Sequence, residues 1–500
     1  MTNHFWLNYY YYFLDIFVKE VFRLWFCQWI KFIQFPSHNP HLSKEVADFG
    51  SAHSRGLPKQ KFIHNLETIA TMRGSPRGVA PRENKEGEPT EMCKGKYIYI
   101  HEIPREFNVQ LLEQCHTLSE WTDMCRYLSN GGFGPPLLQA AELSASLSNS
   151  WFRTHQFSLE VLFHTRMQQY PCLTSNSRTA VAIYVPFYAG LEASRCLWNH
   201  NHTIRDAGPL RFADWVKRQP EWEAFGGCDH FMVAGRITWD FRRVKNEAGE
   251  WGNKLLNLPE MRKMTTLLVE GSPWDNNDVA IPYPTYFHPS SDSEISIWQT
   301  QVMKFKRKVM FSFAGGGRPH MKESIREHIM QQCRQSKHCK LLACNNLGVG
   351  KCNSPEKVME LFEESVFCLQ PPGDSATRRS IFDSILAGCI PVFFHPNSFS
   401  GYKWHFPQNQ SSYSVYIPES HVRSRELNIE SQLLQISSGE IKKLQKAVIQ
   451  LIPGLVYAHP KKTHLQKFHD AFDIAVQGVL NQILHLKLLH SSNGSCTHKK

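Results

Sequence analysis

Two arginines stand where a proline-rich turn passes into a predicted helix. The run Leu369–Arg379 has a strand end, a Pro-Pro-Gly turn, two hydroxyl side chains and then the helix start. Arginines at a helix start oppose the helix dipole, which favours anions there. A bound anion resolves this conflict, because backbone N–H groups, hydroxyls and guanidinium groups all bind phosphate. The residues that we expect to hold a diphosphate are Gly373, Ser375, Thr377, Arg378 and Arg379.

A carboxylate lies one helical turn further on. Asp383 follows Arg379 by four residues, so both share one face of the predicted helix. Acidic residues in dinucleotide-binding folds accept the hydroxyls of a ribose, and we expect the same of Asp383. The alternative is an Arg379–Asp383 surface ion pair, which contributes only about 0.2–0.5 kcal/mol.

A glycine-rich turn is the second candidate for phosphate binding. Gly315, Gly316 and Gly317 follow a predicted strand and precede Arg318. Glycines let the backbone approach a phosphate, and Arg318 and Arg326 can reach the same diphosphate. The spacing is not that of a P-loop, and an ordinary strand–helix turn is the alternative.

Alternating strands and helices must position these residues. The apolar runs rich in β-formers fall into two series, with a polar break at residues 288–294 between them. The first series is 97–100, 180–187, 231–237 and 266–270, and the second is 309–314, 340–343, 366–370 and 390–395. The helices that we expect around the second series include 321–335, one opened by Ser354 and Pro355, 377–387, 438–457 and 462–490. This alternation predicts an α/β fold of two Rossmann-like halves with a cleft between them.

The expected domains follow from these breaks. Residues 5–35 are aromatic and aliphatic but carry Asp15, Lys19 and Arg23, so they resemble an interfacial amphipathic helix more than a spanning one. A buried core helix is the alternative. The predicted parts are a membrane-associated segment at 1–35, a linker at 36–92, a first α/β domain at 93–288, a second with its terminal helices at 289–480, and a tail at 481–500.

Composition narrows the class of protein. Of the 500 residues, 42% are hydrophobic and 20% are charged, which is typical of a globular chain. The net charge is +11, but the basic residues are scattered and no zinc-finger or RNA-binding motif is present, so we expect no nucleic-acid partner. Cys333, Cys339, Cys344 and Cys352 are close in sequence without zinc-site spacing, so we expect disulfides there. Asn-x-Ser/Thr acceptors stand at Asn201, Asn409 and Asn493.

At this level of detail the chain resembles a known family, the exostosin-like glycosyltransferases of family 47, and within it the plant xyloglucan galactosyltransferases. The resemblance covers roughly residues 93–479. The segments that carry it are Cys368–Asp383, Cys389–Phe394, Tyr97–Asn108, Gly132–Gly134, Tyr184–Gly190, Gln219–Trp222, Asp229–Arg243, Ile281–Pro289 and Trp404–His405. So many matching segments are far more specific than any single motif.

The resemblance implies a GT-B fold, with two Rossmann-like domains facing a cleft. It implies inverting transfer of galactose from UDP-galactose to xylose side chains of xyloglucan. It also implies a single-pass type II protein of the Golgi membrane with a lumenal catalytic domain, and complexes with other Golgi glycosyltransferases. By position, Asp383 matches the ribose-binding carboxylate, and Arg318, Arg378 and Arg379 are the diphosphate candidates.

An inverting transferase needs a base near the acceptor hydroxyl. Asp229 and His230 open a predicted strand and Asp240 closes it, so we rank Asp229 first, then Asp240 and His230. His155 and Glu160 are further candidates, and Trp239, Trp274, Tyr286 and Trp404 can stack on sugars. No Asp-x-Asp motif is present in the folded part, so we expect no cofactor and metal-independent chemistry, with arginines stabilising the diphosphate.

Two alternatives remain open. One is another donor, such as UDP-galacturonic acid, or another hemicellulose acceptor. The other is an inactive Golgi scaffold, because Cys228 stands before Asp229 where the family resemblance leads us to expect an arginine.

Overall fold

The computed structural model describes residues 91–120, 122–137, 145–197, 201–247, 250–319, 321–344, 354–459 and 465–493. The chain divides into two units, one of residues 1–85 with 320–322 and one of residues 86–319 with 323–500. All that follows concerns the second unit. The predicted membrane-associated segment at 1–35 and almost all of the predicted linker lie outside the described residues. Among the residues described, no helix is both long and apolar enough to cross a bilayer.

The first half of this unit contains a parallel sheet with strand order β1-β2-β3-β4-β5. Its strands are β1 (Ile98–Ile100), β2 (Ala182–Tyr184), β3 (His230–Ile237), β4 (Thr265–Glu270) and β5 (Asp278–Ala280). Side chains alternate between the faces of a strand. Accordingly, Phe231 and Val233 join one hydrophobic cluster while Met232 and Ala234 join another. Both faces of the sheet are therefore covered, which explains the continuous apolar runs.

The second half contains another parallel sheet, with strand order β10-β9-β8-β6-β7. Its strands are β6 (Val309–Gly315), β7 (Cys339–Ala343), β8 (Ser365–Gln370), β9 (Ile390–Phe393) and β10 (Val415–Tyr416). The expected α/β class with two parallel sheets is confirmed. The strands β5 and β10 lie outside the predicted runs, and β10 has only two residues, too few to show a pattern.

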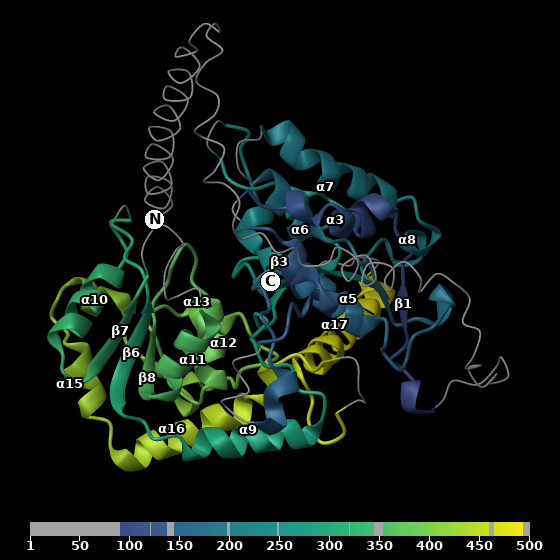
Figure 1. The fold of residues 1–500 in the computed structure, drawn as a ribbon. Helices are drawn as coiled ribbons and strands as arrows, with labels where there is room; N and C mark the ends of the chain where they lie inside the picture. The colour runs from purple at the N-terminus through teal and green to yellow at the C-terminus, as the bar shows by residue number, and fades with distance from the viewer. Residues whose placement is uncertain are drawn as a thin grey trace, which may run out of the picture. The chain divides into compact units, whose positions relative to one another are not determined.

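Helices surround both sheets (Figure 1). Their bounds are α3 (Val109–Glu113), α4 (Cys125–Leu128), α5 (Leu159–Met167), α6 (Ala189–Cys196), α7 (His202–Val216), α8 (Pro220–Phe225), α9 (Asp292–Lys304), α10 (Arg326–Gln335), α11 (Pro355–Glu363), α12 (Arg379–Leu386), α13 (Asn397–Ser400), α14 (Glu419–Arg423), α15 (Ile429–Leu434), α16 (Ser438–Leu451) and α17 (Ala471–Asn493). Short 3-10 turns join them, among them η3 (Arg105–Phe107) and η9 (Thr238–Phe241).

The last helix returns to the first half. In Figure 1 the yellow helix α17 lies beside α5, and it packs against β2. Gln482 donates to Thr265 Oγ1 at 3.2 Å, and Asp470, just before α17, pairs with Arg166 at 2.9 Å. The helix runs through residue 481, where we expected the tail to begin. It starts at Ala471 rather than residue 462, because the Asp470 carboxylate caps it by accepting from Asp473 N at 2.8 Å.

Two other helix predictions have different outcomes at their starts. The sequence pattern of residues 151–169 also predicts a helix; the structure has α5 there, which begins only at Leu159, because Trp151 and Phe152 form β-bridges with Phe287 and Pro136. The helix α11 begins at Pro355 as predicted, with the Ser354 hydroxyl accepting from the N–H of the third helical residue.

Cysteines stabilise both halves. The disulfides between described residues are Cys93–Cys172, Cys115–Cys125, Cys333–Cys339 and Cys368–Cys389. The Cys333–Cys339 bond confirms the expectation for the dense run of cysteines. Cys228 and Cys344 are also disulfide-bonded. Cys352 lies outside the described residues.

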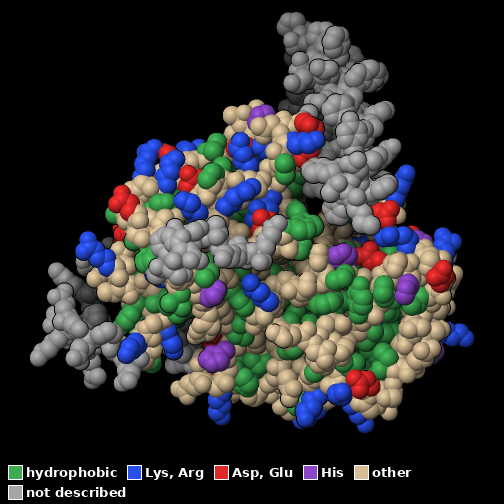
Figure 2. Space-filling model, turned by 180° about the vertical axis from the view of Figure 1, so that it is seen from behind, with side chains coloured by type: hydrophobic (Ala, Val, Ile, Leu, Met, Phe, Trp, Pro, Cys, Tyr) green, Lys and Arg blue, Asp and Glu red, His purple; other side chains and the backbone are tan. Residues whose placement is uncertain are grey.

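The surface charge is mixed. On the face drawn in Figure 2, lysine and arginine side chains are interleaved with acidic ones rather than gathered in one stripe. A groove for nucleic acid requires a concentrated basic surface, and this face has none among the residues that the structure describes.

Candidate functional site

The loop between β8 and α12 folds around a glycine. Arg378 is the N-cap of α12 and has an extended backbone, so its side chain turns back over the loop. A Cβ atom on Gly373 would overlap Arg378 Nη1. Glycine at position 373 is therefore needed to seat this guanidinium against the loop backbone.

Three arginines meet beside this loop. Arg326, in the first turn of α10, is only 1% exposed and donates from Nε to Pro372 O at 2.8 Å and from Nη1 to Gly316 O at 3.1 Å. Its Nη2 atom is buried and makes no hydrogen bond to the residues that the structure describes. Burial, with the added repulsion of Arg378 and Arg318, lowers the pKa of Arg326 to about 8. Charges that perturb one another in this way mark a place for a counter-ion.

Asp374 and Glu270 offset part of the positive charge of this cluster. Asp374 is two-thirds exposed and forms an ion pair with Arg318 at 3.0 Å. Burial lowers the pKa of the Arg378 guanidinium, which Asp374 opposes and Arg318 reinforces. The arrangement of Arg318, Arg326 and Arg378 around the glycine-rich turn therefore suits a multiply charged anion such as a diphosphate.

Arg379 points to other partners than Arg378 does. It donates to Thr154 O in the first half at 2.5 Å, and its guanidinium lies 3.6 Å from the centre of the Tyr286 ring. Its Nε atom is 3.4 Å from Asp383 Oδ2, so the predicted i,i+4 pair exists, but it is buried rather than on the surface. Asp383 is 3% exposed, and burial raises its pKa to about 6, against the opposing effect of Arg379.

The Arg379–Asp383 pair has unused hydrogen-bonding groups. Asp383 Oδ1 and Arg379 Nη2 are buried and make no hydrogen bond within the described residues. Leaving a buried polar atom unpaired costs about 1–3 kcal/mol. A ligand with hydroxyls, such as a ribose, would satisfy both atoms.

Glu270, the last residue of β4, was missed in the sequence. Its Oε2 atom accepts from Ser375 Oγ at 2.6 Å, Thr377 N at 2.9 Å and Thr377 Oγ1 at 2.5 Å. These are the donors that we assigned to an anion, and here a carboxylate of the first half occupies them. The available signal was one carboxylate at the carboxyl end of an apolar strand, where ligands of parallel sheets bind.

Asp229 and His230 lie far from this loop. Asp229 directly precedes β3 and His230 begins it, whereas Ile237 ends the strand level with Glu270. Seven strand residues span about 23 Å. Asp229 is bonded to His230 Nδ1 at 2.9 Å and is paired with Lys487 at 3.4 Å. This placement argues against both as catalytic groups for a reaction at the loop, because a base must lie within hydrogen-bond reach of its proton.

Asp240 lies at the expected end of β3, but its oxygens are already bonded. Arg236 Nε donates to Oδ2 at 2.5 Å, and Trp251 Nε1 donates to Oδ1 at 2.7 Å. Asp240 is 2% exposed. In this arrangement Asp240 positions Arg236 and Trp251.

His155 and Glu160, the further candidates for the base, both lie near Arg236. Burial, with Arg379 and Arg236 nearby, lowers the pKa of His155 to about 3, so the ring is neutral at pH 7. Its Nδ1 atom accepts from Phe157 N at 3.2 Å, which leaves the proton on Nε2 and makes that atom a donor. Burial raises the pKa of Glu160 to about 7, and its carboxylate accepts from the N–H groups that open α6.

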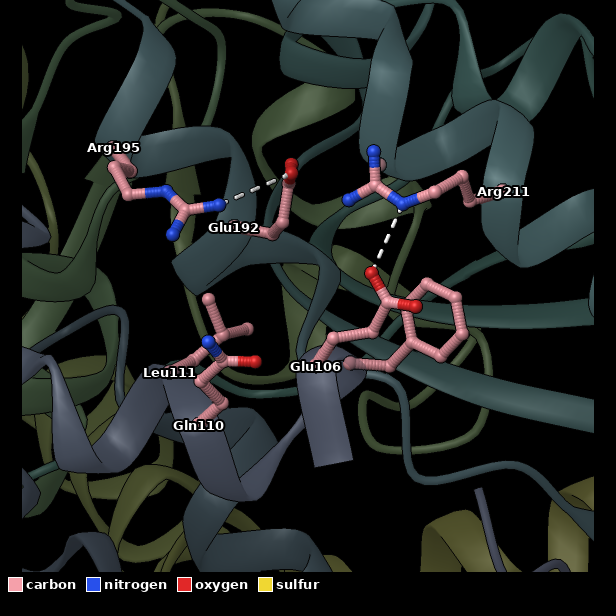
Figure 3. A pocket seen from close by; sticks show the side chains of 8 residues that line it. Glu106, Gln110, Leu111, Glu192, Arg195 and Arg211 are labelled. Carbon is pink, nitrogen blue, oxygen red and sulfur yellow. Dashed lines mark hydrogen bonds and ion pairs between the residues drawn. The ribbon is translucent and has the colours of Figure 1, made fainter. Parts of the chain in front are cut away.

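A separate small cavity lies in the first half between η3, α3, α6 and α7. It holds about 120 Å³ and contains no predicted site residue. Figure 3 shows its charged side chains facing one another, with Arg211 bonded to Glu106 at 2.9 Å and Arg195 3.7 Å from Glu192. These ion pairs satisfy each other, so the cavity is a solvated gap between helices.

No group of three or more His, Cys, Asp or Glu side chains in the described part of the chain is arranged to hold a metal ion. Metal-independent chemistry stays a prediction.

Known proteins resemble this chain over most of its length. Residues 92–433 match the model of the exostosin GT47 domain. The xyloglucan galactosyltransferase MUR3 of Arabidopsis thaliana is 50% identical over 80% of this chain and 64% of its own length. A probable xyloglucan galactosyltransferase of the same plant, GT12, is 47% identical over 82% and 81%. The xyloglucan-specific galacturonosyltransferase 1 of that plant is 42% identical over 78% and 58%.

Proposed function

This chain belongs to the exostosin GT47 family, and we propose that it is an inverting glycosyltransferase. In this proposal it moves galactose from UDP-galactose to xylosyl side chains of xyloglucan. The observation that carries the proposal is the group of three arginines beside the β8–α12 loop, with a buried guanidinium nitrogen that makes no hydrogen bond within the described part of the chain. The choice of galactose as the sugar and of xyloglucan as the acceptor rests on the relatives that are named xyloglucan galactosyltransferases.

Different side chains of this site would bind the diphosphate and the ribose of the donor. Arg318, Arg326 and Arg378 would hold the diphosphate, and Asp383 with Arg379 would receive the ribose hydroxyls. The acceptor hydroxyl attacks the anomeric carbon and gives its proton to a general base, while the bond from that carbon to UDP breaks and negative charge grows on the leaving oxygen. Fixed guanidinium groups stabilise that charge without reorganising, which lowers the barrier.

The Ser375 and Thr377 donors require a rearrangement. Glu270 occupies them in this structure. A donor that uses them must displace its carboxylate, and mutual repulsion between carboxylate and diphosphate favours that displacement. The diphosphate of the donor then takes the place of the Glu270 carboxylate at these hydroxyl groups.

We also propose a Golgi membrane location with a lumenal catalytic domain, and complexes with other Golgi glycosyltransferases follow from the same family resemblance. The four disulfides support an oxidising compartment. Asn201 and Asn409 of the glycosylation acceptors are exposed, as that modification requires.

The test is a transfer assay with the purified full chain. A xylosylated cello-oligosaccharide is offered with UDP-galactose, or with UDP-galacturonic acid as the competing donor. We expect a galactosylated product, and none with Arg326→Leu, which removes the buried guanidinium. A product with UDP-galacturonic acid alone would establish the second donor, which the galacturonosyltransferase relative makes the main alternative. UDP binding without any turnover would favour the inactive scaffold instead.

A further inference from the structure

Two tryptophans form an open aromatic surface next to the β8–α12 loop, which we call the donor loop because we propose that it binds the sugar donor. Trp239 lies in η9, directly after β3, and Trp274 lies in the connection from β4 to β5. The rings are 5.7 Å apart between centroids and meet edge to face at 64°. Trp274 is 64% exposed and Trp239 is half-buried. The pair thus offers a bare indole to solvent.

The connection that carries Trp274 is fixed. Trp274 N donates to Ser272 Oγ at 3.2 Å, and Ser272 Oγ donates to Asp275 Oδ2 at 2.7 Å. Asp275 is paired with Arg242 at 3.2 Å, which also holds Asp278 at 2.6 Å. An exposed indole held in a hydrogen-bonded turn is a surface on which the face of a sugar ring can stack.

One side chain links this pair to the donor loop. Trp239 Nε1 donates to Glu270 Oε1 at 3.3 Å, while the other carboxylate oxygen accepts from Ser375 and Thr377. A molecule stacked on the tryptophans therefore lies one residue away from the place proposed for the donor.

The charges around the pair select the ligand. Glu270 accepts from Trp239, and Asp275 directly follows Trp274 in the chain, with Arg242 paired to Asp275 at 3.2 Å. An anionic polysaccharide would be repelled by these carboxylates. A neutral sugar presents C–H groups to an indole face and hydroxyls to carboxylates, so it matches both features.

We propose that Trp239 and Trp274 form the acceptor subsite, on which the neutral glucan backbone stacks so that its side-chain hydroxyl meets the donor at the loop near Glu270. This subsite rests on the proposed function, and it names the residues that position the acceptor.

The experiment compares Trp274→Ala with Trp274→Phe and with Met303→Ala, a matched control because Met303 is 61% exposed on α9. The acceptor is the xylosylated cello-oligosaccharide. We expect Trp274→Ala to raise the acceptor KM roughly five- to tenfold, the loss of one aromatic stacking contact. The donor KM and the melting temperature should stay unchanged, Trp274→Phe should recover part of the affinity, and Met303→Ala should match wild type.

Direct binding separates this inference from the proposed function. The same oligosaccharide is titrated into each full-chain variant while the intrinsic tryptophan fluorescence is followed, with no donor present. Binding by wild type that is weakened in Trp274→Ala supports the subsite even if UDP-galactose is not the donor. Failure of wild type to bind, or an unchanged dissociation constant in Trp274→Ala, overturns it even if galactose transfer is demonstrated.

Discussion

Replacing Asp383 by asparagine tests the ribose assignment through pH. Asp383 is buried beside Arg379, and its pKa is raised to about 6. If the charged carboxylate receives the ribose hydroxyls, donor binding requires its deprotonated form. About 90% of the carboxyls are ionised at pH 7 and about 10% at pH 5, so the affinity should fall roughly tenfold, or about 1.4 kcal/mol.

The assay is calorimetric titration of wild type and Asp383→Asn with UDP-galactose between pH 5 and pH 8. The sugar-linked diphosphate lacks the terminal phosphate ionisation near pH 6. We expect wild-type affinity to fall below pH 6, and Asp383→Asn to bind at least tenfold more weakly at pH 7 with a flat pH profile. Equal affinity of the two proteins at pH 7 would refute the assignment.

Asp383→Asn should weaken donor binding but increase the free energy of unfolding at pH 7. The folded-state pKa of Asp383 is raised from 3.8 to about 6, so the folded protein binds this proton more tightly than the unfolded chain does. The contribution of Asp383 to the free energy of unfolding is therefore greatest below pH 3.8 and is lost as pH rises through about 6, a change of about 3 kcal/mol. Asp383→Asn removes that cost, so at pH 7 it should unfold at higher denaturant concentration than wild type.

Three further predictions use other parts of the molecule. Gly373→Ala should displace the Arg378 guanidinium and weaken UDP binding about tenfold in calorimetry, with little change in melting temperature, because the loop is at the surface. Asp229→Asn should leave kcat within about twofold, since Asp229 precedes β3, and the far end of that strand, level with Glu270, is about 23 Å further along; a hundredfold loss in a transfer assay would restore it as the base. Cys228→Ser should lower the free energy of unfolding by about 2–4 kcal/mol, because Cys228 is disulfide-bonded; unchanged denaturant unfolding would contradict that bond.

The disulfide also changes how the inactive-scaffold alternative is tested. Cys228→Arg would introduce the arginine that the family resemblance leads us to expect, but it would also remove the disulfide bond of Cys228. Loss of activity in that variant therefore has a structural cause. Turnover by the unaltered chain is the measurement that decides between enzyme and scaffold.

Local sequence determined the architecture and the donor loop. Strands such as Phe231–Ile237 are continuous apolar runs because both sheet faces are buried, and that pattern is visible without a structure. The arginines at the start of α12 oppose the helix dipole, and this local conflict alone indicated an anion. The family resemblance rests on the same short-range motifs, and the exostosin GT47 match confirms it.

Tertiary structure decided which groups meet. Arg378 and Arg379 are adjacent in sequence, yet one joins Arg326 and the other reaches Thr154, because the N-cap and the first helical residue direct their side chains differently. Glu270 meets Thr377 across 107 residues, a contact that no local pattern encodes. The distance of Asp229 from the loop likewise follows from the register of parallel strands, which is set only when the sheet forms.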